Sequence, residues 1–233
     1  MLISTFVPGL AKIRLVSVGQ DQYFIANLSF PFQLKSLHLD RCDLDEGFIH
    51  GLLAASAASL LHISIVDDST EFNTGLSFAQ FAQSDAPGPF PRLQYLSLTN
   101  NGYGNGESSL GDLDETLALC PKLETLDVSR YNQYAHFDIV NELRCLLNPT
   151  VTLLSITISE YAPFNLALIE TILALPSMKN VRELDLIDGE LDESCDWVGA
   201  GRRLCAGLKA RGIVVTHNET ELSEICKPSS RGY

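Results

Sequence analysis

Basic residues are scarce in this sequence relative to acidic ones. Its 233 residues include 16 Lys and Arg against 29 Asp and Glu, which gives a net charge of −13 at pH 7. Nucleic acids and anionic membrane surfaces repel so acidic a chain, so we expect neither as a partner. No apolar stretch approaches the roughly 18 residues that a membrane-spanning helix needs, so we also expect no membrane span.

Short motifs of catalysis and metal binding are missing as well. The six cysteines form no Cys-x-x-Cys pair and no Cys/His set at zinc spacing. The sequence also lacks His-Glu-x-x-His, Gly-x-Ser-x-Gly and the Gly-Lys-Ser/Thr of a phosphate-binding loop. We therefore expect no enzyme activity, cofactor or metal. Reduced cysteines are the default for such a chain, which favours an intracellular location, cytoplasmic or nuclear.

A repeated motif, Leu-x-x-Leu-x-Leu, runs along most of the chain. Within each copy apolar and polar residues alternate, which predicts a strand with one buried face. The copies recur about every 28 residues. Seven clear copies and one degenerate copy begin at Leu10, Leu34, Leu60, Leu93, Leu123, Leu153, Val181 and Ala210.

Between the copies, apolar residues recur at helical spacing and predict outer helices. The predicted helices lie near residues 44–53, 110–119, 137–147, 166–173 and 195–208. A strand, a turn and a helix repeated in one register favour a solenoid over a doubly wound sheet. We predict one α/β domain over residues 1–217, a horseshoe-shaped solenoid of seven or eight repeats with a parallel concave sheet. A polar tail is predicted over residues 218–233.

The second copy carries a resemblance to a known family. Residues 34–47 read Leu-Lys-Ser-Leu-His-Leu-Asp-Arg-Cys-Asp-Leu-Asp-Glu-Gly. This segment resembles the leucine-rich repeat (ribonuclease-inhibitor-like) family, and within it the cysteine-containing repeats of F-box proteins. The lead-ins Pro-Arg-Leu93 and Pro-Lys-Leu123 are similar to those of fungal F-box-like proteins. At the ninth consensus position, which is Asn or Cys in the family, only Cys42 and Asn101 conform.

The resemblance implies a function and a surface. It implies a non-catalytic protein–protein interaction scaffold, the substrate-recognition part of an F-box-type ubiquitin ligase subunit. The polar strand positions would line the concave face and run from basic residues over small hydroxyls to acidic ones. We predict as partner-binding residues of this face Arg14, Lys35, His38, Asp40, His62, Ser64, Tyr95, Ser97, Thr99, Asp127, Ser129, Thr157, Glu183 and Asp185. Phe90, Tyr103 and Tyr131 are predicted as aromatic anchors in rim loops.

Other interpretations stay open. His38 and His62 lie on neighbouring predicted strands, which leaves a regulator of a GTPase or a weak hydrolase that uses this region. Glycosylation sequons at Asn27 and Asn218 leave an extracellular recognition domain. Few residues precede the first motif, so we expect an uncapped N-terminal edge through which the chain self-associates.

Overall fold

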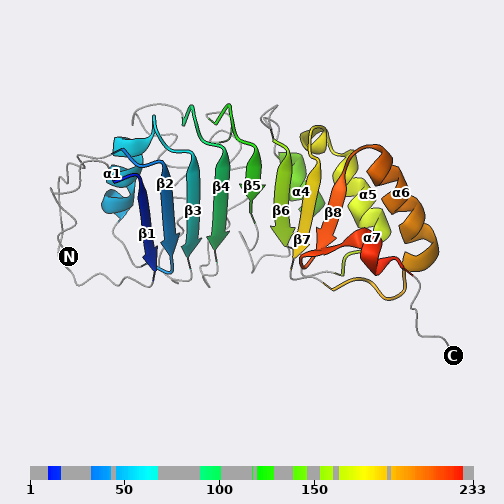
Figure 1. Ribbon diagram of the computed structural model, residues 1–233. Helices are drawn as coiled ribbons and strands as arrows, with labels where there is room; N and C mark the ends of the chain where they lie inside the picture. The colour runs from blue at the N-terminus through cyan, green and yellow to red at the C-terminus, as the bar shows by residue number, and fades with distance from the viewer. Residues whose placement is uncertain are drawn as a thin grey trace.

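A single sheet organises the computed structural model, which describes residues 10–16, 33–42, 46–67, 90–100, 117, 120–128, 139–145, 153–159, 163–187 and 190–227. Within these residues nine strands follow one another across the sheet in chain order (Figure 1). They are β1 (Lys12–Val16), β2 (Ser36–Asp40), β3 (His62–Asp67), β4 (Tyr95–Asn100), β5 (Thr125–Asp127), β6 (Ser155–Ser159), β7 (Glu183–Ile187), β8 (Val214–His217) and β9 (Thr220–Glu221). Strands β1 to β8 pair in parallel, and β9 runs antiparallel to β8. The fold is therefore α/β with a mostly parallel sheet.

The strands lie where the repeated motif predicts them. Each of β1 to β7 begins two residues after the first position of its copy. The eighth copy is displaced, because Val215 pairs with Leu184, the fourth residue of the preceding copy, where we had placed Ile213. Ala210 is the last residue of a helix, so the final copy begins two residues later than predicted.

The apolar motif positions face a continuous core together with the helices. In the view of Figure 1, α1 (Glu46–Ser56), α4 (Ile139–Cys145) and α5 (Leu166–Ala174) lie behind the sheet. Their buried residues, which include Leu52, Leu143 and Ile169, join one cluster with strand residues such as Leu37 and Ile156. These helices confirm three of the predicted ones. Of the helix predicted near 110–119, the described part is Leu117, which is helical and buried.

The helix predicted over 195–208 is formed by two segments. Trp197–Gly201 (η2) winds as a π-helix, and α6 (Arg202–Ala210) continues it as an α-helix. The Asp196 carboxylate caps the start by accepting the backbone N–H groups of Gly199 and Ala200, at 2.7 and 3.0 Å. A π-helix does not keep the 3.6-residue period, and Val198, an apolar residue within the predicted helix, is 47% exposed.

The polar tail predicted from residue 218 differs from the structure. The chain turns back at Asn218 and Glu219, both with positive φ, and continues into β9 and α7 (Leu222–Ile225). Two consecutive positive φ angles suit a tight hairpin that follows the twist of the strands. Leu222 and Cys226 are buried, so residues 218–226 form part of the folded unit.

The prediction of Phe90 as a rim anchor is wrong, because its side chain is 0% exposed and lies in the core. Phe90 stands three residues before the first leucine of its motif. Ala57, Cys120 and Met178 occupy the same position in their copies, and all three are buried. The Phe90 carbonyl also accepts the Leu93 N–H at 3.2 Å, which closes the turn into β4.

We expect Phe90→Ala to lower the free energy of unfolding by about 3–5 kcal/mol, because it leaves a cavity in a closed core. Urea denaturation followed by circular dichroism measures the change. The matched control is Arg92→Ala in the same turn; Arg92 is exposed, and the expected change is within about 0.5 kcal/mol. An F90A variant as stable as the wild type would contradict the buried position.

Candidate partner-binding face

Polar strand residues form rows across the sheet face opposite α1, α4 and α5, which we call the open face. Register pairing joins seven predicted residues into one line, the central row: Arg14, His38, Ser64, Ser97, Asp127, Thr157 and Asp185. A second line, the leading row, comprises Lys12, Ser36, His62, Tyr95, Thr125, Ser155 and Glu183. Because paired strands are about 4.8 Å apart, each row is continuous at the scale of a bound segment.

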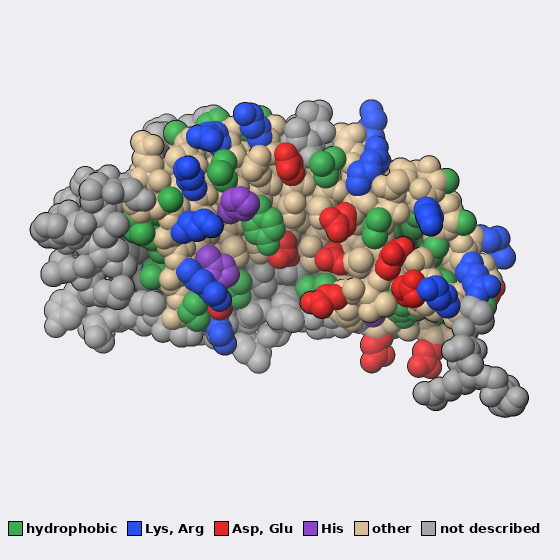
Figure 2. All heavy atoms as spheres, viewed as in Figure 1, with side chains coloured by type: hydrophobic (Ala, Val, Ile, Leu, Met, Phe, Trp, Pro, Cys, Tyr) green, Lys and Arg blue, Asp and Glu red, His purple; other side chains and the backbone are tan. Residues whose placement is uncertain are grey.

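The charge of the open face changes sign along these rows. Figure 2 looks onto this face and shows Lys and Arg gathered over the first strands and Asp and Glu from the middle onward, with further cations at the C-terminal end. Lys12, Arg14 and Lys35 are exposed at the basic end, and Glu183 is exposed at the acidic end. Asp40 interrupts the basic end, but its Oδ1 accepts the Nε–H of Arg41 at 3.1 Å.

The centre of the face is fixed by contacts between its own side chains. The ring of His62 stacks on that of Tyr95, with centroids 6.1 Å apart and an interplanar angle of 28°. Ser97 donates from Oγ to Asp127 Oδ2 at 2.9 Å and also hydrogen-bonds Tyr95. Burial raises the pKa of Tyr95, and the Asp127 charge raises it further. Ser97 is 3% exposed, so its hydroxyl positions Asp127 rather than meeting a partner.

The two histidines lie diagonally rather than opposite each other. His38 pairs with Ser64, and His62 pairs with Ser36. The Nε2 atom of His38 is buried and has no hydrogen-bond partner among the described residues, so it does not bond the neighbouring Ser64. A pairing that would activate a hydroxyl as a nucleophile is therefore not formed through this atom. In the part of the chain that the structure describes, no three His, Cys, Asp or Glu side chains group as a metal site.

Four carboxylates gather at the acidic end of the face. Burial raises the pKa of Asp185 above its ordinary value, and the charges of Glu183, Asp127 and Glu219 raise it further. Glu219 comes from the turn between β8 and β9, so the hairpin adds to a charge cluster that begins on the central strands. The cluster favours a cationic partner group, which would relieve its internal repulsion.

The remaining predicted residues are distributed differently. Lys35 directly precedes β2 and is exposed, and Thr99 lies in β4 opposite Val66. Ser129, Tyr103 and Tyr131 lie outside the described residues, as do residues 1–9 at the N-terminal edge where we expected self-association.

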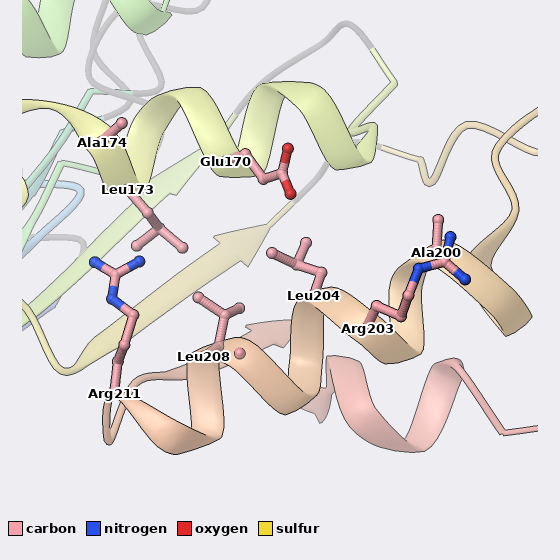
Figure 3. A pocket seen from close by; sticks show the side chains of 9 residues that line it. Glu170, Leu173, Ala174, Ala200, Arg203, Leu204, Leu208 and Arg211 are labelled. Carbon is pink, nitrogen blue, oxygen red and sulfur yellow. The ribbon is translucent and has the colours of Figure 1, made fainter.

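A groove on the helical side was missed by sequence reasoning. It lies between α5 and α6 and has a volume of about 540 Å³. Figure 3 shows Leu204 and Leu208 along it, with Arg203 and Arg211 toward its two ends. The available signal was the cluster of cations between residues 202 and 211 in an otherwise acidic chain. A pattern in one sequence could not show that α5 lies beside these cations.

No protein-family model matches the chain, and a search of curated proteins gives no significant match. Among the helices of the described residues, none has the length and apolarity required to cross a membrane. The open face is therefore interpreted from its own register, contacts and charge.

We expect Asp185→Asn to stabilise the protein at pH 7 by about 0.2–1 kcal/mol, the range of partly exposed charge pairs. The raised pKa means that the folded protein binds this proton more tightly than the unfolded chain does. The contribution of Asp185 is therefore most favourable below its ordinary value of 3.8 and is lost as pH rises through the folded pKa. Urea midpoints of wild type and variant should differ at pH 7 and converge near pH 3.

Asp192→Asn is the control of opposite sign. Its Oδ1 accepts the N–H and the Oγ–H of Ser194, at 2.9 and 2.6 Å, and these bonds lower the pKa of Asp192. This stabilisation is present above the unfolded pKa and is lost as pH falls through the folded one. We expect D192N to be less stable than the wild type at pH 7. A D185N variant that is less stable than the wild type at pH 7 would contradict the unfavourable charge assigned to Asp185.

Proposed function

We propose that this chain is a leucine-rich repeat solenoid that acts as a non-catalytic protein-interaction scaffold, with the open face as its concave binding surface. Eight parallel strands in chain order, the first seven each placed by one copy of the motif, support the proposed architecture. The turn after β2 adds support, since Cys42 donates from Sγ to the Asp40 carbonyl at 3.4 Å. A cysteine that closes this turn is what the resemblance to F-box repeats implies.

The central row is the observation that carries the proposal. It presents a cation at Arg14 and a carboxylate at Asp185, with a line of polar side chains between them. Opposite charges at the two ends orient a partner during encounter and disfavour the reversed orientation. The partner is a protein segment with acidic residues toward β1 and basic residues toward β7.

The most specific role that we propose is substrate recognition for an F-box-type ubiquitin ligase, which places the protein inside the cell. Among the described residues Cys42, Cys195, Cys205 and Cys226 are free thiols, which suits a reducing compartment. One feature favours the extracellular alternative: Asn218, the asparagine of a glycosylation sequon, is exposed at the hairpin turn. The hydrolase or GTPase-regulator alternative would have to use His38, whose Nε2 atom has no hydrogen-bond partner in the described part of the chain.

The test compares proteins captured from native cell lysate by the tagged chain and by the variant Glu183→Lys/Asp185→Lys. We expect the wild type to recover a stoichiometric partner and the variant to lose at least nine-tenths of it, because two attractive charges become repulsive. Lys12→Glu/Arg14→Glu should weaken the same partner from the other end of the row. Quantitative mass spectrometry measures the recovery.

A matched control applies the same charge change away from the rows. Glu170 on α5 and Glu193 on the turn before η2 are both exposed, and Glu170→Lys/Glu193→Lys should retain the partner. Equal recovery by the wild type and by the E183K/D185K variant would count against the open face as the binding surface. So would recovery of no protein above a tag-only sample.

A further inference from the structure

Two cysteines from different elements meet at the C-terminal end of the fold. Cys205 lies on α6 and Cys226 directly follows α7, and their Sγ atoms are 3.9 Å apart. Cys205 is half-buried, whereas Cys226 is 0% exposed. The open face makes no use of either thiol.

The surrounding backbone holds Cys226 in this position. Gly201 provides the space, since a Cβ there would lie only 2.7 Å from Cys226 Sγ. Arg202 donates from Nε to the Cys226 carbonyl at 3.0 Å, which ties the end of α7 to the start of α6. Contacts of α7 with α6, β8 and β9 complete the support. The short distance between the sulfur atoms is thus fixed by packing on several sides.

A pocket of about 510 Å³ gives access to the pair. Both cysteines line it, together with the apolar side chains of Leu208 and Leu222 and the cationic ones of Arg202 and Lys209. A small disulfide that carries carboxylates would meet both the thiols and the cationic side chains that attract its carboxylates. Glu221 also lines the pocket, and its negative charge would repel those carboxylates.

We propose that Cys205 and Cys226 form a disulfide by exchange with a low-molecular-weight, carboxylate-bearing disulfide of the glutathione type. The Cys205 thiolate attacks one sulfur of the small disulfide, and a mixed disulfide forms as the first small thiolate leaves. The Cys226 thiolate then attacks Cys205 Sγ and displaces the second. Two protein thiols are oxidised, one small disulfide is reduced to two thiols, and the two protein protons pass to the leaving thiolates.

The resting pair is protected from rapid oxidation. Burial, with a smaller contribution from the nearby Cys226, raises the pKa of Cys205 to about 12. Burial also raises the pKa of Cys226. Because only the thiolate attacks, exchange is slow at neutral pH and speeds up as pH rises. The disulfide therefore forms when the ratio of small disulfide to small thiol stays raised for a long time, and a brief rise in that ratio leaves the pair reduced.

Oxidation would tie the C-terminal elements together covalently. The bond closes a loop that contains β8, β9 and α7, and so restricts the unfolded chain. We expect the Tm of the oxidised protein to rise by about 5–10 °C.

Incubation of the full chain with glutathione disulfide tests the proposal. Intact mass should fall by about 2 Da, with a Cys205–Cys226 cross-linked peptide after digestion, and dithiothreitol should reverse both changes. Between pH 7 and pH 9 the rate should rise about tenfold per pH unit.

Variants separate this pair from the other thiols. Cys205→Ser and Cys226→Ser should each abolish the mass loss and the rise in Tm, so failure of one variant to fold leaves the other. Cys195→Ser is the matched control and should behave as the wild type, because Cys195 is a half-buried free thiol outside the pair. No reaction at pH 9, a mixed disulfide that persists at Cys205, or the same mass loss in C205S would overturn the proposal.

Discussion

One carbonyl before each of the strands β1 to β6 accepts two backbone N–H groups from the next copy of the motif. Ala11 O accepts from Lys35 N and Ser36 N at 2.8 and 3.1 Å, and the pattern recurs at Lys35, Leu61, Gln94, Glu124 and Leu154. A strand that slips by one residue turns its buried side chains to solvent, so these shared acceptors and the apolar core enforce the same register. The position of every side chain on the sheet follows from that register.

The two faces of the sheet are products of this constraint. On one face Leu37, Ile63, Leu96 and Ile156 are brought into line and buried under the helices. The residues that alternate with them are brought into equally regular rows on the other face. Polar side chains that are some 30 residues apart in the sequence therefore become neighbours, as the hydrogen bond from Ser97 to Asp127 illustrates. The charge gradient is a property of the rows, not of any single segment.

Sequence periodicity predicts the strands that share the repeated motif, and its predictions are wrong where a copy departs from that motif. Seven strands were found because their copies share one alternation, and the eighth was misplaced because Ala210, an apolar residue, belongs to a helix end. The prediction of Phe90 as a loop residue is wrong because it ignores the repeat: Ala57 and Cys120 stand at the same position of their copies, and both are apolar and buried. Contacts between distant elements leave no such signal. No local sequence pattern predicts the contact between Cys205 and Cys226 or the groove beside α5.

The hairpin of β8 and β9 connects the two chemical features of the molecule. Its turn carries Glu219, whose charge raises the pKa of Asp185 on the open face. Its second strand carries Glu221, whose charge contributes to the raised pKa of Cys205. One hairpin thus contributes a charge to the field at the acidic end of the face and another to the field at the thiol pair. Because α7 directly follows this hairpin, its packing on α6 determines where the carboxylates of Glu219 and Glu221 lie. The elements that cover the last parallel strand therefore also set the charge at the acidic end of the open face.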